Sequence, residues 1–154
     1  MSKLKICIFN IIIIFILISC NYSASEDKPE IDNKENIANY KKMLLKYPDN
    51  CFYLEQIACS YQFLNDYSNA VDFYKKTIDK CPNRPINKFQ LGICYYLIMD
   101  RNNGIKYMNE AIRDAETDNN TAVAEMFKRE KKLWLEKWDS VKKLEWNKKG
   151  SNLE

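Results

Sequence analysis

Residues 51–84 read CFYLEQIACSYQFLNDYSNAVDFYKKTIDKCPNR, and residues 85–118 read PINKFQLGICYYLIMDRNNGIKYMNEAIRDAETD. In both stretches apolar residues recur at spacings of three and four, which is typical of amphipathic helices. Clusters of Asn, Asp, Pro and Gly interrupt the pattern at intervals. The pattern therefore predicts helices near residues 34–47, 51–64, 68–80, 85–98, 102–115 and 119–146.

A second regularity joins the two stretches, because residues 34 positions apart match in kind. The matched pairs are Ile57 with Leu91, Ala58 with Gly92, Tyr61 with Tyr95, Ala70 with Gly104, and Ile78 with Ile112. The same step backwards takes Pro82 to Pro48. A helix-turn-helix period of 34 residues indicates stacked repeats, each of which buries its apolar face against its neighbours.

The detailed pattern resembles the tetratricopeptide repeat (TPR). The first copy runs Leu54-x2-Ile57-Ala58-x2-Tyr61, then Ala70-x3-Tyr74 and Pro82, with Leu54 where the family has Trp. The second copy runs Lys88-x2-Leu91-Gly92-x2-Tyr95, then Gly104-x3-Met108 and Ala111, with Lys88 in the Trp position and Glu116 in the Pro position. The resemblance implies an all-α solenoid of helix-turn-helix units wound as a right-handed superhelix. Another all-helical stack of hairpins is the alternative.

The resemblance divides the chain into about two and a half repeats and their flanks. We expect a repeat region over 35–118, made of a half repeat 35–48 and full repeats 51–84 and 85–118. A long capping helix follows over 119–147, and a disordered tail over 148–154. Terminal repeats need such a cap because one of their faces is apolar. Three tryptophans in this region, Trp134, Trp138 and Trp146, keep open the alternative of a docking helix or a homodimer formed through it.

The N-terminus has the features of an export signal. Lys3 and Lys5 precede an apolar run over residues 6–18, which is shorter than the roughly 20 residues that span a bilayer. Leu17-Ile18-Ser19-Cys20 resembles the bacterial lipobox, in which the cysteine receives the lipid. We therefore expect a lipoprotein signal peptide over 1–19, lipidated Cys20, and a polar, flexible tether over 20–34. An ordinary signal peptide cleaved after Ala24 is the alternative.

An anchored chain of this kind is expected in the bacterial cell envelope. Asn21 follows the anchor cysteine, where an Asp favours inner-membrane retention in enteric-type bacteria. The resemblance therefore favours the outer membrane, with the domain facing the periplasm.

Composition excludes several classes of function. The 154 residues include no histidine and three glycines, so histidine-based catalysis and glycine-rich phosphate loops are absent. The net charge of +3 is too small for a nucleic-acid footprint. No two of the cysteines in the repeats form a close zinc-binding pair. The sequence thus predicts a protein that is not an enzyme and that uses no cofactor or metal.

Four cysteines follow Cys20, and an even number in an exported domain suggests disulfides in one of three pairings. They are Cys51, Cys59, Cys81 and Cys94. The TPR arrangement implies Cys51–Cys81 first, because one residue opens a helix and the other closes its antiparallel partner. It implies Cys59–Cys94 second, between the first helices of adjacent repeats. Four small buried thiols are the alternative.

In TPR proteins the first helices of successive repeats line a concave groove that holds a partner. By that analogy the groove has an apolar, aromatic surface suited to an amphipathic helix or apolar peptide. Its residues are Phe52, Glu55, Cys59, Gln62, Phe63, Ile86, Phe89, Ile93, Tyr96, Leu97 and Phe127. The alternative is that the last helix folds across the groove and fills it. The resemblance implies a membrane-anchored scaffold or adaptor, with a small immunity-type lipoprotein against a periplasm-directed toxin as the second function.

Overall fold

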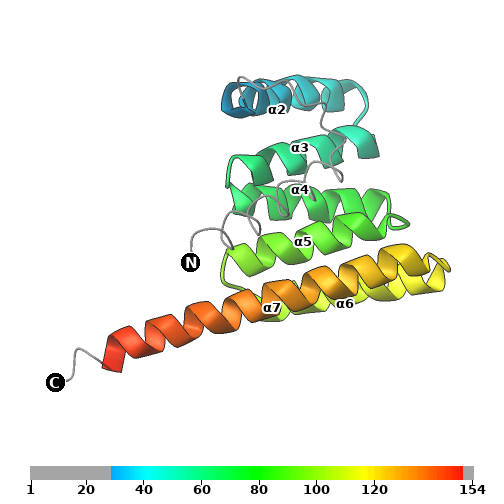
Figure 1. The fold of residues 1–154 in the computed structure, drawn as a ribbon. Coiled ribbons are helices and arrows are strands. Elements are labelled where there is room, and N and C mark those ends of the chain that lie inside the picture. Colours follow the sequence, from blue (N-terminus) through cyan, green and yellow to red (C-terminus); the bar gives the residue numbers. More distant parts are fainter. Residues whose placement is uncertain (1–28, 151–154) are drawn as a thin grey trace.

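The computed structural model describes residues 29–150, and this part of the chain contains helices and no strand. The helices are α2 (Pro29–Lys46), α3 (Cys51–Phe63), α4 (Tyr67–Lys80), α5 (Pro85–Leu97), α6 (Arg101–Thr117) and α7 (Thr121–Gly150) (Figure 1). Four of the six begin and end within two residues of the predicted bounds. The signal peptide, Cys20 and residues 151–154 lie outside the described residues.

The helices begin where short polar side chains accept hydrogen bonds from the first turn. The Asp66 carboxylate accepts from the backbone N–H of Asn69 at 3.2 Å, and Asp100 accepts from that of Asn103 at 3.1 Å. These two caps are 34 residues apart, so the repeat extends to the turns. The preceding turns also match, since Asn65 and its equivalent Met99 both have positive φ, at 59° and 69°. Each turn is therefore set by local sequence.

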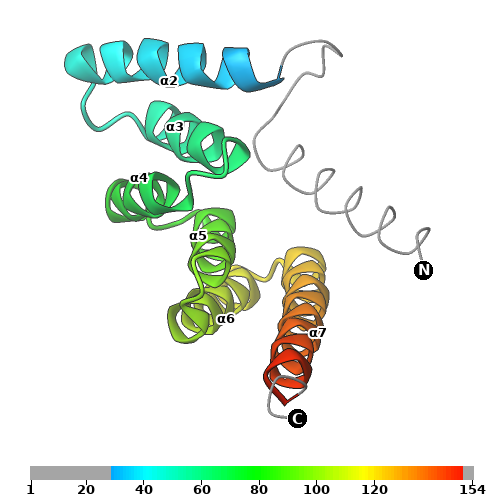
Figure 2. The ribbon, with the colours of Figure 1, turned by 90° about the vertical axis from the view of Figure 1, so that its left-hand side faces the viewer.

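Successive helices pack side by side as a stack of antiparallel pairs (Figure 2). Helices α3 and α4 form one pair and α5 and α6 the next. Helix α2 stands where the second helix of a preceding repeat would lie, and α7 stands where the first helix of a third repeat would lie. The predicted all-α, TPR-like solenoid is confirmed, and α3, α5 and α7 line one side of it while α4 and α6 line the other.

Helices α5 and α6 approach each other closely where the sequence has paired glycines. A Cβ atom on Gly92 of α5 would lie 2.8 Å from the backbone oxygen of Gly104 on α6. It would also lie 3.0 Å from the backbone nitrogen of Met108. The equivalent positions in the first pair, Ala58 and Ala70, are fully buried. The small residues therefore mark the helix crossings, as the repeat register predicts.

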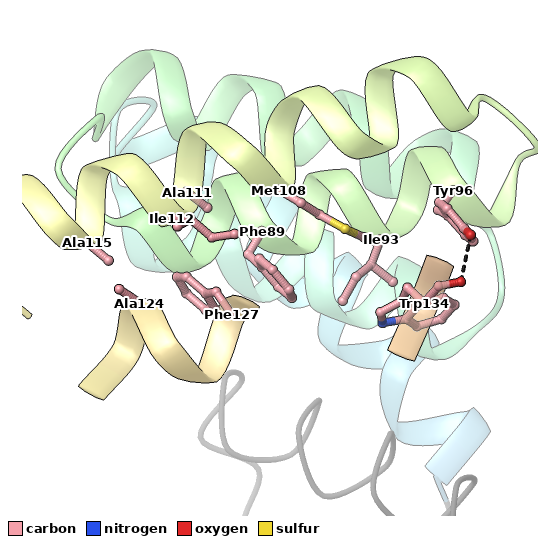
Figure 3. Packing of buried hydrophobic residues seen from close by; sticks show 10 residues of the cluster. All are labelled: Phe89, Ile93, Tyr96, Met108, Ala111, Ile112, Ala115, Ala124, Phe127 and Trp134. Atoms are coloured by element: carbon pink, nitrogen blue, oxygen red, sulfur yellow. Dashed lines mark hydrogen bonds between the residues drawn. The ribbon is translucent and has the colours of Figure 1, made fainter. Parts of the chain in front are cut away.

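The largest apolar core joins α5, α6 and α7 (Figure 3). Phe89 and Phe127 are fully buried and stack with their ring centroids 4.4 Å apart. Further along α7, Trp134 packs edge-on against Tyr96, whose hydroxyl donates to the Trp134 carbonyl at 2.6 Å. The first part of α7 thus covers the end of the stack, as expected of a cap.

The two ends of the described region differ from the expected boundaries. Helix α2 begins at Pro29, so residues 29–34, assigned to the flexible tether, are helical. Proline suits a first helical position because its ring fixes φ and the missing N–H has no helical partner there. At the other end α7 continues to Gly150, beyond the predicted 147, and projects past α5 and α6 (Figure 1). Within residues 29–150, no helix is long and apolar enough to cross a membrane.

Candidate functional site

The predicted groove residues fall on three helices of one side, and the structure separates them into two groups. Those on α5 and α7 are almost completely enclosed, namely Phe89, Ile93, Tyr96 and Phe127. Leu97 and Ile86 are partly buried against the same core. These six residues form an aromatic and aliphatic block between α5, α6 and α7 rather than an open surface. The prediction of an exposed apolar groove is therefore wrong for this half, because α7 occupies it, which was the alternative.

The predicted groove residues on α3 are more polar than those on α5 and α7. Glu55 is buried and forms an ion pair with Arg84, the residue that precedes α5. Burial raises the pKa of the Glu55 carboxyl above its usual range, although the Arg84 guanidinium opposes this shift. A buried carboxylate with one cationic partner joins the first repeat to the loop that begins the second.

A chain of polar side chains continues across three helices. The Tyr74 hydroxyl of α4 donates to the Gln62 side-chain oxygen of α3 at 2.8 Å. The Gln62 amide in turn donates to Gln90 of α5 at 3.1 Å. The Cys59 sulfur lies 3.3 Å from the same tyrosine hydroxyl. These contacts hold α3, α4 and α5 in register, because buried polar groups cost free energy unless they are paired.

Sequence reasoning placed Gln62 and Cys59 in this row but missed Gln90, Asn87 and Arg84. Gln90 lies between Phe89, a predicted groove residue, and Leu91, a residue of the repeat pattern that faces the core. Helical periodicity alone therefore did not single it out. Arg84 lies in a turn, where no periodic signal exists. The positions equivalent to Gln90 and Arg84 in the first repeat are Gln56 and Asn50, which are polar as well. This repetition of polar residues is the signal that could have identified Gln90 and Arg84.

Exposed apolar side chains gather at the opposite end, around α2 and the start of α3. Phe52 is 51% exposed, and its ring lies edge-on to Tyr40 of α2 with centroids 6.0 Å apart. Met43, Leu45 and Tyr47 are also exposed there. Phe63, at the far end of α3, is partly buried. Exposed large apolar side chains of α2 and α3, and of the turn between them, are therefore found together at this end.

The cysteines confirm one predicted disulfide and contradict the other. Cys51 and Cys81 are bonded, with Cα atoms 6.3 Å apart, and the bond joins the start of α3 to the end of α4. Cys94 is a free, buried thiol, so the predicted Cys59–Cys94 bond is wrong. The repeat equivalent of Cys94 is Ser60, not Cys59. One residue turns a helical side chain by about 100°, so the two sulfurs point in different directions.

Within residues 29–150, no group of three His, Cys, Asp or Glu side chains is placed to hold a metal ion. Burial raises the pKa of Tyr74 well above its usual range, and its hydroxyl is used to donate to Gln62.

Comparison with known families agrees with this architecture. Residues 53–84, which form the α3–α4 pair and the turn after it, match the tetratricopeptide repeat family. A comparison with curated protein sequences finds no match to the chain. The matched repeat and the stack of helix pairs around it form a TPR-like solenoid, and TPR domains generally bind protein partners.

Proposed function

We propose that this protein is a lipid-anchored scaffold of a bacterial cell envelope that holds a protein partner at the periplasmic face of the outer membrane. Cys20, at the end of the apolar run, is the proposed lipid attachment site. Two acyl chains on one cysteine make release from a membrane negligible, because each buried methylene contributes about 0.8 kcal/mol. The observation that carries the proposed binding role is the repeat over residues 53–84.

The proposed docking surface is the α2–α3 end. In the described region α2 has no first helix before it, so its repeat is incomplete. Tyr40, Met43 and Phe52 offer apolar contacts there, and the Glu55–Arg84 pair lies beside them on the groove side. An amphipathic helix of the partner matches this surface, because it can place apolar side chains against Met43 and Phe52 and keep its polar face toward water.

Site-specific photo-crosslinking in the native envelope tests the binding proposal. A photo-reactive amino acid at Phe52 should give a discrete crosslinked product, and the same group at Asp79, on the outer side of α4, should not. Mass spectrometry of the product then distinguishes an assembly component from a toxin, which is the immunity-type alternative. Equal crosslinking from both positions, or none from Phe52, would refute docking at this end.

The anchor is tested separately. Cys20→Ala removes the proposed lipid attachment and should abolish partition of the mature protein into the detergent phase. A variant that is still processed and still partitions as the unaltered protein does would exclude the lipoprotein assignment. Because Phe52 lies in the folded domain, the crosslinking result does not depend on this outcome.

A further inference from the structure

Lysine ammonium groups lie over aromatic rings on the outer side of the solenoid, in an arrangement that repeats. In the first unit, Lys41 of α2 lies 5.2 Å from the ring centroid of Tyr61 and 5.7 Å from that of Phe73. Its ammonium also donates to the Tyr61 hydroxyl at 2.7 Å. Lys76 covers the other ring of this unit, 4.6 Å from the Phe73 centroid. Tyr61 and Phe73 contact each other, with centroids 5.6 Å apart.

The second unit repeats the first after 34 residues. Lys75, the equivalent of Lys41, lies 5.4 Å from the ring centroid of Tyr95, the equivalent of Tyr61. Tyr95 stacks on Tyr107, the equivalent of Phe73, with centroids 5.5 Å apart. Lys106 then lies 5.3 Å from the Tyr107 centroid. We call these eight residues the lysine–aromatic ladder.

The ladder keeps its charge outward while its rings belong to the fold. Tyr61, Phe73 and Tyr107 are partly buried, whereas all four lysines are exposed. A hydrogen bond to Tyr95 raises the pKa of Lys75, so this ammonium remains charged at neutral pH. Asp72 and Asp79 lie one helical turn from Lys75 and Lys76, and Glu110 lies one turn from Lys106, so four lysines and three carboxylates leave this side with a net charge of +1. Lysines held against rings have already lost rotational freedom, so further contacts cost less entropy.

The ladder does not continue to the C-terminal end. The third set of equivalent positions holds Asn109, Arg129 and Val141, which have no aromatic ring among them. The lysines therefore lie on α2, α4 and α6, and of these α2 is the described helix nearest to Cys20 in the sequence. Eight residues separate Cys20 from Pro29, and a fully extended chain of that length spans only about 30 Å. An anchor at Cys20 would thus keep α2 close to the headgroups.

We infer that the lysine–aromatic ladder is a docking surface for anionic lipid headgroups, on which the anchored domain lies with its outer side against the membrane. Lysine and tyrosine suit this environment, since their apolar parts pack on the protein and their polar ends reach the interface. The inference rests on the proposed anchor for the nearness of the membrane, but the ladder itself is a property of the fold. Contact through this side leaves the exposed apolar side chains at the α2–α3 end available to a protein partner.

Lysine acetylation of the full chain tests the inference. The protein is purified from membranes in detergent and reconstituted into vesicles of phosphatidylcholine alone or mixed with phosphatidylglycerol. Acetylation rates at Lys76 and Lys106 are read by mass spectrometry, with Lys137 on α7, which lies over the Trp134 ring outside the ladder, as the internal reference. We expect slower acetylation of the ladder lysines only with phosphatidylglycerol, and high salt should restore their reactivity because it screens exposed charges.

A matched pair of variants sharpens the comparison. Lys41→Gln/Lys75→Gln should lose the protection at Lys76 and Lys106, because each lysine near an anionic surface contributes about fivefold to binding. The control variant Lys128→Gln/Lys132→Gln has the same net charge as Lys41→Gln/Lys75→Gln. It should keep the protection at Lys76 and Lys106. All four positions are exposed, so both variants should fold, which circular dichroism checks.

Three outcomes would overturn the inference. They are equal acetylation on both vesicles, equal effects of the two variants, and equal protection by soluble poly-glutamate, which would assign the ladder to acidic protein chains instead. Intact mass of the same sample reports on the anchor independently. If Cys20 carries no lipid, the anchor fails, and salt-sensitive flotation of the chain with the phosphatidylglycerol vesicles still decides whether the ladder binds them.

Discussion

The crossing of α5 and α6 at Gly92 allows a quantitative prediction for Gly92→Ala. The new Cβ would lie 2.8 Å from the Gly104 oxygen, 2.8 Å from the Met108 Cγ and 3.0 Å from the Met108 nitrogen. Two of these three atoms belong to the backbone, so the helices must move apart. Overpacking of this kind costs about 1–3 kcal/mol, and the upper part of that range applies because backbone has to shift.

Helix propensity acts in the opposite direction. Replacing a glycine inside a helix by alanine contributes about 1 kcal/mol in favour of the folded state. The net expectation for Gly92→Ala is therefore a loss of about 2 kcal/mol in the free energy of unfolding. At roughly 4 °C per kcal/mol for a domain of this size, the melting temperature should fall by roughly 8 °C. Urea unfolding under non-reducing conditions, followed by circular dichroism, measures the change.

Gly104→Ala is the matched control at the same crossing. Its Cβ would lie 3.1 Å from the Gly92 oxygen and 3.2–3.3 Å from atoms of the Tyr96 side chain. A shift of a few tenths of an ångström relieves these contacts, so the propensity gain of about 1 kcal/mol should offset most of the cost. A Gly92→Ala protein as stable as the unaltered chain, or more stable, would show that the two helices are not in this close contact.

Three further predictions concern the core and the cysteines. Cys81→Ser should lower the free energy of unfolding by about 3–4 kcal/mol in the urea assay, because it opens a loop with a sequence separation of 30, and an unchanged stability would mean that the Cys51–Cys81 bond does not form. Phe127→Ala should cost about 3–5 kcal/mol in the same urea assay, since it removes a fully buried ring stacked on Phe89, and a loss below 1 kcal/mol would mean that α7 is not docked. Burial raises the pKa of the Cys94 thiol, so maleimide at pH 8 should label it only after unfolding, and rapid labelling of the native protein would contradict its position.

The fold was largely predictable because its signals are local. Helical periodicity, the caps at Asp66 and Asp100 and the small residues at Ala58 and Gly92 each act within one helix pair. The 34-residue period then repeats the same pair along the chain. Stacking follows, because each pair leaves an apolar face that only its neighbour can cover. The Cys51–Cys81 pairing followed from the same register, since it needs only the positions of two helix ends.

The candidate site was less predictable because it depends on what covers each residue. Ile93 and Phe127 occupy the groove register in sequence, but the position of α7 decides whether they face a partner or the interior. Periodicity identifies the face of a helix and does not identify its neighbour. For the same reason the sequence placed Cys59 beside Cys94, although a difference of one residue within the repeat turns their side chains apart.

The sequence by itself therefore determined the helices and their repeat, because short-range spacing and capping control them, and the TPR resemblance implied the Cys51–Cys81 bond through the positions of two helix ends. Only the tertiary structure decided that α7 occupies the C-terminal half of the groove, that Gln62 and Gln90 join adjacent repeats, and that lysines cover the rings of Tyr61 and Tyr95. These features bring together residues 20 to 40 positions apart. Their contacts depend on the packing distance and rotation of whole helices, which no local pattern records.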